Sequence, residues 1–209
     1  MQKHYLLGLG ADRDDSKSEL STKELILEAG HKAITAKSYH ACGLKEILEM
    51  AGVPKGSFYH HFKSKEDFGL ALIETSTDEY NQYLREFLTN RKQSPVERLK
   101  SLFDDKRDYY VANDLVCECA IPKMALELSQ LSEPMRAALK YSYDSAASIM
   151  AQCIREGQAS GEITNSTDAD ILANMIKCGF QGVTIRVQID KSMQPYDDYI
   201  ALIFSSILK

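Results

Sequence analysis

Apolar residues recur at helical spacing along most of this chain of 209 residues, and this periodicity restricts the fold more than any other feature of the sequence. In one segment the spacing i, i+3, i+4, i+7 is followed by Leu44, Ile47, Leu48 and Ala51, which places them on one face of a helix. The most strand-like stretch, residues 183–189, is rich in β-branched residues but fits a buried helix equally well. The sequence therefore predicts an all-α fold.

Residues that typically begin and end helices divide this pattern into segments. Ser21 with Glu24, and Ser94 with Glu97, are spaced as capping boxes, and Gly52 is typical of the residue that follows a helix. We expect helices from Ser21 to a break at residues 38–40, over 44–51, from Pro54 to about Phe62, from Ser64 to about Asn90, over 94–112, from Pro122, over 132–160, from 167 and after Pro195.

The segments differ in length, which predicts a division into three parts. Residues 1–20 are expected to form a loosely ordered leader, residues 21–67 a domain of short helices, and residues 68–209 a larger helical domain. No apolar run approaches the roughly 18 residues of a membrane span, and the start of the chain lacks the features of a secretory signal. The five cysteines are scattered and odd in number, so the simplest interpretation is a reduced, cytoplasmic protein with no membrane partner.

The short helix expected from Pro54 to Phe62 has two chemically different faces. On a helical wheel of about 100° per residue, Phe58 and Phe62 lie close together, while Gly56, His60 and Lys63 lie roughly opposite. A glycine on the polar face has no side chain, so the backbone there can approach another surface closely. An apolar seam towards a scaffold and a polar, basic outer face are what a helix-turn-helix needs to enter the major groove of DNA, although a solvated helical hairpin has the same pattern.

The charge distribution supports the DNA-binding interpretation, although the net charge alone argues against it. The chain carries a net charge of −5, which disfavours binding to a dense polyanion. Residues 37–65, however, contain five lysines and two glutamates, while residues 66–209 carry a net charge of −7. Ser64 and Lys65 also begin a helix, where free N–H groups and an ammonium suit a phosphate. The basic head is therefore expected to approach DNA while the acidic body is repelled by it.

Residues 53–66, Val-Pro-Lys-Gly-Ser-Phe-Tyr-His-His-Phe-Lys-Ser-Lys-Glu, resemble the helix-turn-helix signature of the TetR family of bacterial repressors, and the resemblance covers about residues 22–70. It implies a homodimer whose N-terminal domains bind a palindromic operator in double-stranded DNA, and whose larger C-terminal domain binds a ligand and dimerises. By motif position, it implies base-edge contacts from Lys45, Lys55, Gly56 and Ser57, and phosphate contacts from Tyr59, His60 and Lys65.

Two positions depart from the family pattern. Ser38 stands where the family usually has the glycine that ends the first helix, and serine tolerates a left-handed conformation less well. Gly43 stands where a threonine or serine often caps the second helix. Glycine is an acceptable N-cap, so the fold is unaffected, but one side-chain phosphate contact is lost.

Cys117 and Cys119 lie just before the helix expected at Pro122. A thiol near a helix N-terminus ionises more readily, and Lys123 adds to this effect, whereas Glu118 opposes it. The pair is therefore interpreted either as a sensor of oxidants or electrophiles or as two ordinary buried thiols. Residues 119–136 resemble the corresponding segment of the NemR-like, electrophile-responsive branch of the family, in which a cysteine at the position of Cys119 senses reactive compounds.

The remaining candidates concern small molecules and catalysis. An effector pocket in the larger domain could be lined by aromatic residues, which could equally be core and surface residues: Tyr80, Tyr83, Phe87, Phe103, Tyr109 and Tyr110. All five histidines lie in the first third of the chain, away from the cysteine pair, which disfavours a metal site. The sequence contains no glycine-rich phosphate loop, nucleophile elbow or carboxylate pair of plausible geometry, so neither a cofactor nor an enzyme is expected.

Together these patterns favour a transcriptional repressor that binds its operator as a homodimer and is released by a small-molecule or electrophile effector. The last two helices, which are apolar on wide faces, are expected to form the dimer interface as a four-helix bundle. The alternative is an all-helical interaction scaffold that keeps the fold without binding an operator.

Overall fold

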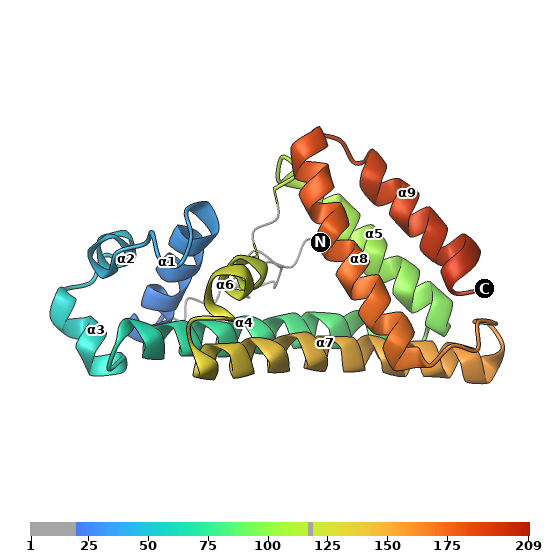
Figure 1. Ribbon diagram of the computed structural model, residues 1–209, viewed down its shortest axis with the longest axis horizontal. Helices are drawn as coiled ribbons and strands as arrows, with labels where there is room; N and C mark the ends of the chain where they lie inside the picture. Colours follow the sequence, from blue (N-terminus) through green and yellow to red (C-terminus); the bar gives the residue numbers. More distant parts are fainter. Residues whose placement is uncertain (1–19, 117–118) are drawn as a thin grey trace. The chain divides into compact units, whose positions relative to one another are not determined.

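Figure 1 shows the computed structural model, which describes residues 20–116 and 119–209. Residues 1–19 of the expected leader, and Cys117, lie outside this description. No strand occurs among the described residues, which confirms the all-α prediction. The elements are α1 (Thr22–Ala36), α2 (Leu44–Ala51), α3 (Lys55–His61), α4 (Lys65–Leu88), α5 (Pro95–Ala112), α6 (Ala120–Leu128), α7 (Glu133–Ser160), α8 (Ala169–Asp190), α9 (Gln194–Leu202) and a short π-helical segment, η1 (Ile203–Ile207).

The described residues form two compact units, each built from two stretches of chain. The first unit contains residues 20–80 and 119–143, and the second contains residues 81–116 and 144–209. Two long helices, α4 and α7, contribute residues to both units. The domain boundary expected between residues 67 and 68 therefore lies inside a continuous helix, and α6 belongs to the same unit as the three short N-terminal helices.

The helix-start signals are present as hydrogen bonds. In the capping boxes of α1 and α5, the hydroxyls of Ser21 and Ser94 accept from the backbone N–H groups of Glu24 and Glu97. The one clear difference is α6, which begins at Ala120 rather than at Pro122. A proline is accommodated there because the first N–H groups of a helix have no intrahelical partner to lose.

Three phenylalanine rings form the centre of the first unit. Phe58 and Phe62, the two residues expected on the buried side of α3, are fully or almost fully buried, and their ring centroids lie 5.3 Å apart. The ring of Phe68 at the start of α4 lies 5.9 Å from Phe58 and 5.4 Å from Phe62. At Gly30 of α1 a Cβ would lie 2.2 Å from Phe68 Cζ, so only glycine lets α1 pack this closely on the cluster.

The connection between α1 and α2, residues 37–43, is called the α1–α2 turn below. Its path needs no left-handed residue at Ser38, because Lys37 ends α1 with φ −114° and ψ −80°. The Ser38 hydroxyl instead accepts from the backbone N–H of Ala41 at 3.3 Å. Gly43 is the N-cap of α2 and makes no side-chain cap, as expected, while Gly52 follows α2 with φ 68°. The departure at Ser38 is thus accommodated locally without backbone strain.

The second unit is held together by aromatic packing between α5, α8 and α9. Tyr110, Val187 and Tyr196 form a buried cluster, and the Tyr196 hydroxyl donates to the carbonyl oxygen of Phe103 at 2.6 Å. The β-branched stretch at residues 183–189 lies within α8 and is helical. Within the described part of the chain, no helix is both long and apolar enough to cross a membrane.

Candidate nucleic-acid interface

The polar face of α3 is open to solvent, as the helical wheel predicts. Gly52 ends α2 in the left-handed conformation, and Pro54, in an extended conformation, is the N-cap of α3. Phe58 anchors the helix with 0% exposure, whereas Lys55, Gly56 and His60 are exposed and Tyr59 is 55% exposed. Among the residues expected to contact DNA from this helix, Ser57 alone is half-buried. The anchored inner side therefore holds the outer side rigidly in position.

Gly56 is not required by the packing of the protein itself. A Cβ added at this position would meet nothing within 4 Å, and Gly56 does not have positive φ. An exposed helical glycine costs about 0.5–1 kcal/mol relative to alanine. The glycine at position 56 therefore lowers the stability of the free protein slightly. It leaves the backbone of α3 uncovered by a side chain on the exposed side of the helix.

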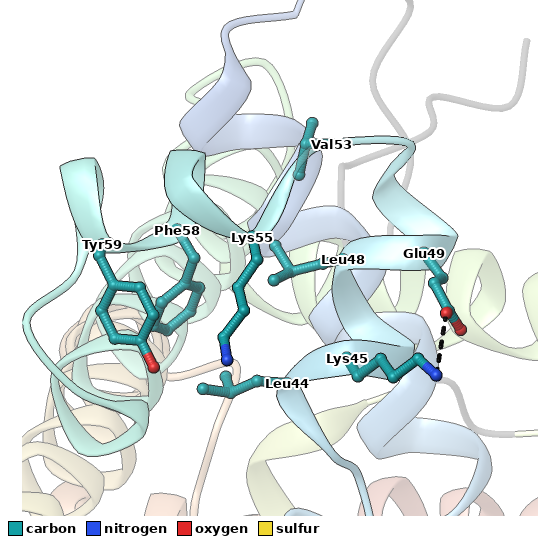
Figure 2. A pocket seen from close by; sticks show the side chains of 8 residues that line it. All are labelled: Leu44, Lys45, Leu48, Glu49, Val53, Lys55, Phe58 and Tyr59. Carbon is teal, nitrogen blue, oxygen red and sulfur yellow. Dashed lines mark ion pairs between the residues drawn. The ribbon is translucent and has the colours of Figure 1, made fainter.

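A hollow of about 400 Å³ lies between α2 and α3. Its lining combines the buried side chains of Leu48 and Phe58 with the half-buried side chains of Leu44 and Val53, so the interior is apolar. Figure 2 shows that Leu44 and Leu48 come from α2, Phe58 from α3 and Val53 from the turn between the two helices. We call this feature the α2–α3 hollow.

Polar side chains surround the α2–α3 hollow. Lys55 and Tyr59 extend from α3, while Lys45 and Glu49 lie on α2 and form an ion pair at 3.7 Å (Figure 2). The Lys45 and Glu49 side chains are 88% and 67% exposed, so the pair is of the kind that contributes little stability and exchanges readily. The hollow thus brings together three of the residues expected to contact DNA.

Lys65 has a different environment from the other expected DNA contacts. Its ammonium donates to the carbonyl oxygens of Tyr39 at 2.7 Å and Cys42 at 2.6 Å, and the Tyr39 hydroxyl donates to the Lys65 carbonyl at 2.7 Å. Burial lowers the pKa of Lys65. Two of the three ammonium donors are therefore used to tie the start of α4 to the α1–α2 turn, and one is left for a phosphate.

Glu127, for which the sequence gives no signal, holds the same turn from α6. Its carboxylate accepts the backbone N–H of Tyr39 at 3.1 Å and that of His40 at 3.0 Å, and it lies 3.0 Å from Nδ1 of the His40 ring. Lys123, one helical turn earlier, donates to the carbonyl oxygen of Thr35 at the end of α1. No local signal reveals these contacts, because the partners are 87 and 88 residues apart.

The hydrogen bonds to Glu127 change its acidity. Burial raises the pKa of this carboxyl group, but the hydrogen bonds from the backbone and ring of His40 and from the backbone of Tyr39 outweigh that effect. The pKa of Glu127 therefore lies below its ordinary value, and the carboxylate is charged at neutral pH. A charged acceptor makes stronger hydrogen bonds to backbone N–H groups than a neutral one does.

The expected effector residues fall in both units. Cys119 belongs to the first unit, where it is the N-cap of α6, is half-buried and packs against the core. Tyr83, Phe87, Phe103, Tyr109 and Tyr110 belong to the second unit. There the Tyr83 hydroxyl donates to Asp105 at 2.8 Å, and its ring lies 5.2 Å from that of Phe87. Tyr83, Phe103 and Tyr110 are buried, so an effector pocket lined by these aromatic residues stays a prediction.

Three short helices with an anchored, outward-facing third helix and a basic rim form a helix-turn-helix head, the architecture of a DNA-binding regulator. Residues 26–72 match the family described as bacterial regulatory proteins of the tetR family, and residues 95–203 match the tetracyclin repressor-like C-terminal domain. The chain therefore belongs to the TetR family of transcriptional regulators, as the resemblance of residues 53–66 predicts.

Sequence and structural similarity to other regulators agrees with this family. It is 32% identical to the transcriptional regulator AcuR of Cereibacter sphaeroides, over 91% of this chain and 86% of that protein. It is 27% identical to the HTH-type transcriptional repressor NemR of Escherichia coli, over 88% and 92%. The crystal structure of the reduced form of E. coli NemR superposes with a TM-score of 0.83 over 90% of this chain and 98% of that one, at 28% identity.

Proposed function

We propose that this chain is a repressor that binds a palindromic operator as a homodimer and leaves it when a small molecule or an electrophile acts on the protein. The observation that carries the proposal is the outer face of α3, where Lys55, Tyr59 and His60 are exposed around a glycine that the fold does not need. Lys45 and Lys55 are assigned to base edges, together with Gly56 and Ser57. Tyr59, His60 and the remaining donor of Lys65 are assigned to phosphates.

The dimer is supported by an apolar face on α8 that the second unit leaves uncovered. Its exposed members, which we call the α8 stripe, are Ile171, Met175, Cys178, Ile185 and Ile189. They lie within about 80° of one another on a helical wheel. A second copy of the chain presents the same stripe and can cover it by a two-fold interface. Two α3 helices then meet successive major grooves, about 34–36 Å apart.

Replacing Gly56 with alanine is expected to stabilise the protein and weaken DNA binding at the same time. The methyl group meets no protein atom within 4 Å, so removing an exposed helical glycine raises the free energy of unfolding by about 0.5–1 kcal/mol. At a surface pressed against DNA the same methyl group acts as overpacking, which reduces operator affinity about tenfold. Urea unfolding and a gel-shift titration against the DNA upstream of the gene measure the two effects.

The increase in stability is the control, because it excludes unfolding of the variant as the cause of weaker DNA binding. If Gly56→Ala binds the operator as tightly as the parent, α3 does not approach DNA closely at this residue. If the parent chain itself gives no sequence-specific and salt-sensitive shift, the protein is an interaction scaffold with the family fold rather than a repressor.

Release of the operator is assigned to Cys119 and α6. Cys119 occupies the N-cap position of α6, and the same helix carries Lys123 and Glu127, which hold the end of α1 and the α1–α2 turn. An adduct on the Cys119 sulfur displaces the start of α6 and thereby favours an arrangement of the turn that no longer fits DNA. A difference of about 1–3 kcal/mol between the two states is a typical coupling between sites.

Cys119→Ser is expected to keep operator binding in the presence of N-ethylmaleimide, whereas the parent loses it. The thiolate adds across the carbon–carbon double bond of the maleimide, and a serine hydroxyl does not react in this way at neutral pH. A gel-shift titration after treatment measures the difference. Cys178→Ala is the control for a second thiol, because Cys178 is exposed in the single chain and belongs to the α8 stripe, where alanine keeps the surface apolar. It should respond like the parent. Equal release of the parent and Cys119→Ser would exclude Cys119 as the switch.

A further inference from the structure

The α2–α3 hollow is lined in part by Lys45 and Lys55, the two lysines that the proposed function assigns to base edges. Its interior is formed by Leu44, Leu48, Val53 and Phe58, none of which offers a hydrogen bond to DNA. Figure 2 shows the Lys55 side chain between Phe58 and Leu48 with its ammonium close to Leu44, while Lys45 extends along α2 beside Glu49. Leu48 and Phe58 belong to the core of the first unit, and Leu44 and Val53 pack against that core. The half-buried side chains of Leu44 and Val53 are therefore the apolar surface that an apolar group of DNA can cover.

The chemistry of the major groove restricts that occupant. Guanine, cytosine and adenine present hydrogen-bond donors and acceptors there, whereas thymine also presents its C5-methyl group, which is apolar. The lining carries the ammonium groups of Lys45 and Lys55 and one carboxylate, that of Glu49, which pairs with Lys45. The remaining positive charge attracts the polyanion to this site and disfavours a neutral apolar partner. The hollow, at about 400 Å³, is large enough for the whole methyl-bearing edge of a base.

We propose that the α2–α3 hollow reads a thymine: each operator half-site places the C5-methyl of one thymine against the apolar lining of the hollow, beside Lys45 and Lys55. This inference rests on the proposed binding of an operator and adds the base that the operator must contain beside the lysine contacts. Leu44 and Val53 are then specificity-determining residues. Leu48 and Phe58 form the buried floor that keeps the hollow in shape.

The test replaces thymine with deoxyuridine, which lacks only the methyl group. After footprinting locates the operator of the full chain, each thymine of a half-site is replaced in turn, and the dissociation constant is measured by fluorescence anisotropy. At one thymine position, replacement in a single half-site should weaken binding about fourfold, which is the factor expected for one buried methyl group. Replacing it in both half-sites should weaken binding about fifteenfold, since distant independent changes add in free energy.

Variants of residues that line the hollow test whether the deoxyuridine penalty arises from contact with the hollow. In Leu44→Ala one wall is removed, so the deoxyuridine penalty at that position should fall below about twofold. Val53→Thr is the second variant. It keeps the shape of the side chain but introduces a hydroxyl, and it should reduce the penalty in the same way. Met50→Ala is the matched control, because Met50 is an apolar residue of α2 that is 51% exposed and does not line the hollow. It should keep the full penalty.

The outcomes separate this inference from the proposed function. Sequence-specific binding without any deoxyuridine penalty overturns the inference alone, and the hollow then faces the sugars of the backbone. A penalty that is equal in the parent, Leu44→Ala and Val53→Thr also overturns it, because the methyl group is then read elsewhere. Absence of specific binding by the parent overturns the repressor proposal together with the inference.

Discussion

Replacing Met175 and Ile185 together with glutamate is expected to convert the protein into a monomer and to reduce operator affinity by about a hundredfold or more. These residues are 60% and 55% exposed in the single chain and lie on the α8 stripe. Two carboxylates on each copy would place four charges in an apolar interface, where charges without partners are strongly unfavourable. A monomer also loses the gain of about 10²–10⁴ in avidity that comes from binding the second half-site intramolecularly.

Sedimentation equilibrium measures the loss of the dimer, and a gel-shift titration measures the loss of affinity. Val111→Glu is the control, because Val111 is 54% exposed on α5 of the same unit and lies outside the α8 stripe. It should remain dimeric and bind DNA like the parent. A parent chain that sediments as a monomer at micromolar concentration, or a monomeric variant with parental affinity, would contradict the proposed dimer.

The sequence predicts most of the helices because their signals are local. A capping box such as Ser21 with Glu24 is complete within four residues, and the Phe58–Phe62 seam follows from the helical period alone. The α8 stripe could not be found in this way. Residues 169–190 are apolar on several sides, and only the packing of α5 and α9 shows which side stays exposed.

The division into units and the support of the helix-turn-helix depend on contacts between distant residues. The boundary expected after residue 67 follows from a change in helix length, but α4 continues through it without any break in the sequence pattern. Lys65 is expected to bind phosphate because it begins a helix, and this stays a prediction. The folded chain brings the carbonyl oxygens of Tyr39 and Cys42 to its ammonium, more than 20 residues away, and these compete with solvent and DNA for its donors.

Glu127→Ala is expected to lower the free energy of unfolding by about 1.5–3 kcal/mol, because hydrogen bonds to a charged group are stronger than average and two backbone donors lose their acceptor. The backbone N–H groups of Tyr39 and His40 are those donors. Since the α1–α2 turn positions α2, operator binding should weaken as well. Urea unfolding at pH 7 measures the stability. Glu133→Ala is the control, since Glu133 also has a lowered pKa but pairs with Arg136 on the surface, and its loss should change little.

The pH dependence of this effect has a definite sign. The folded pKa of Glu127 lies below its ordinary value of 4.5, so the unfolded chain binds the proton more tightly and the carboxylate stabilises the fold at higher pH. That contribution is complete above about pH 5 and is lost as the pH falls through the folded pKa. Glu127→Gln, which cannot ionise, should therefore be less stable than the parent at pH 7 and approach it at pH 3 in urea titrations. A stability difference that is the same at both pH values would show that the turn is held by packing rather than by the charge of Glu127.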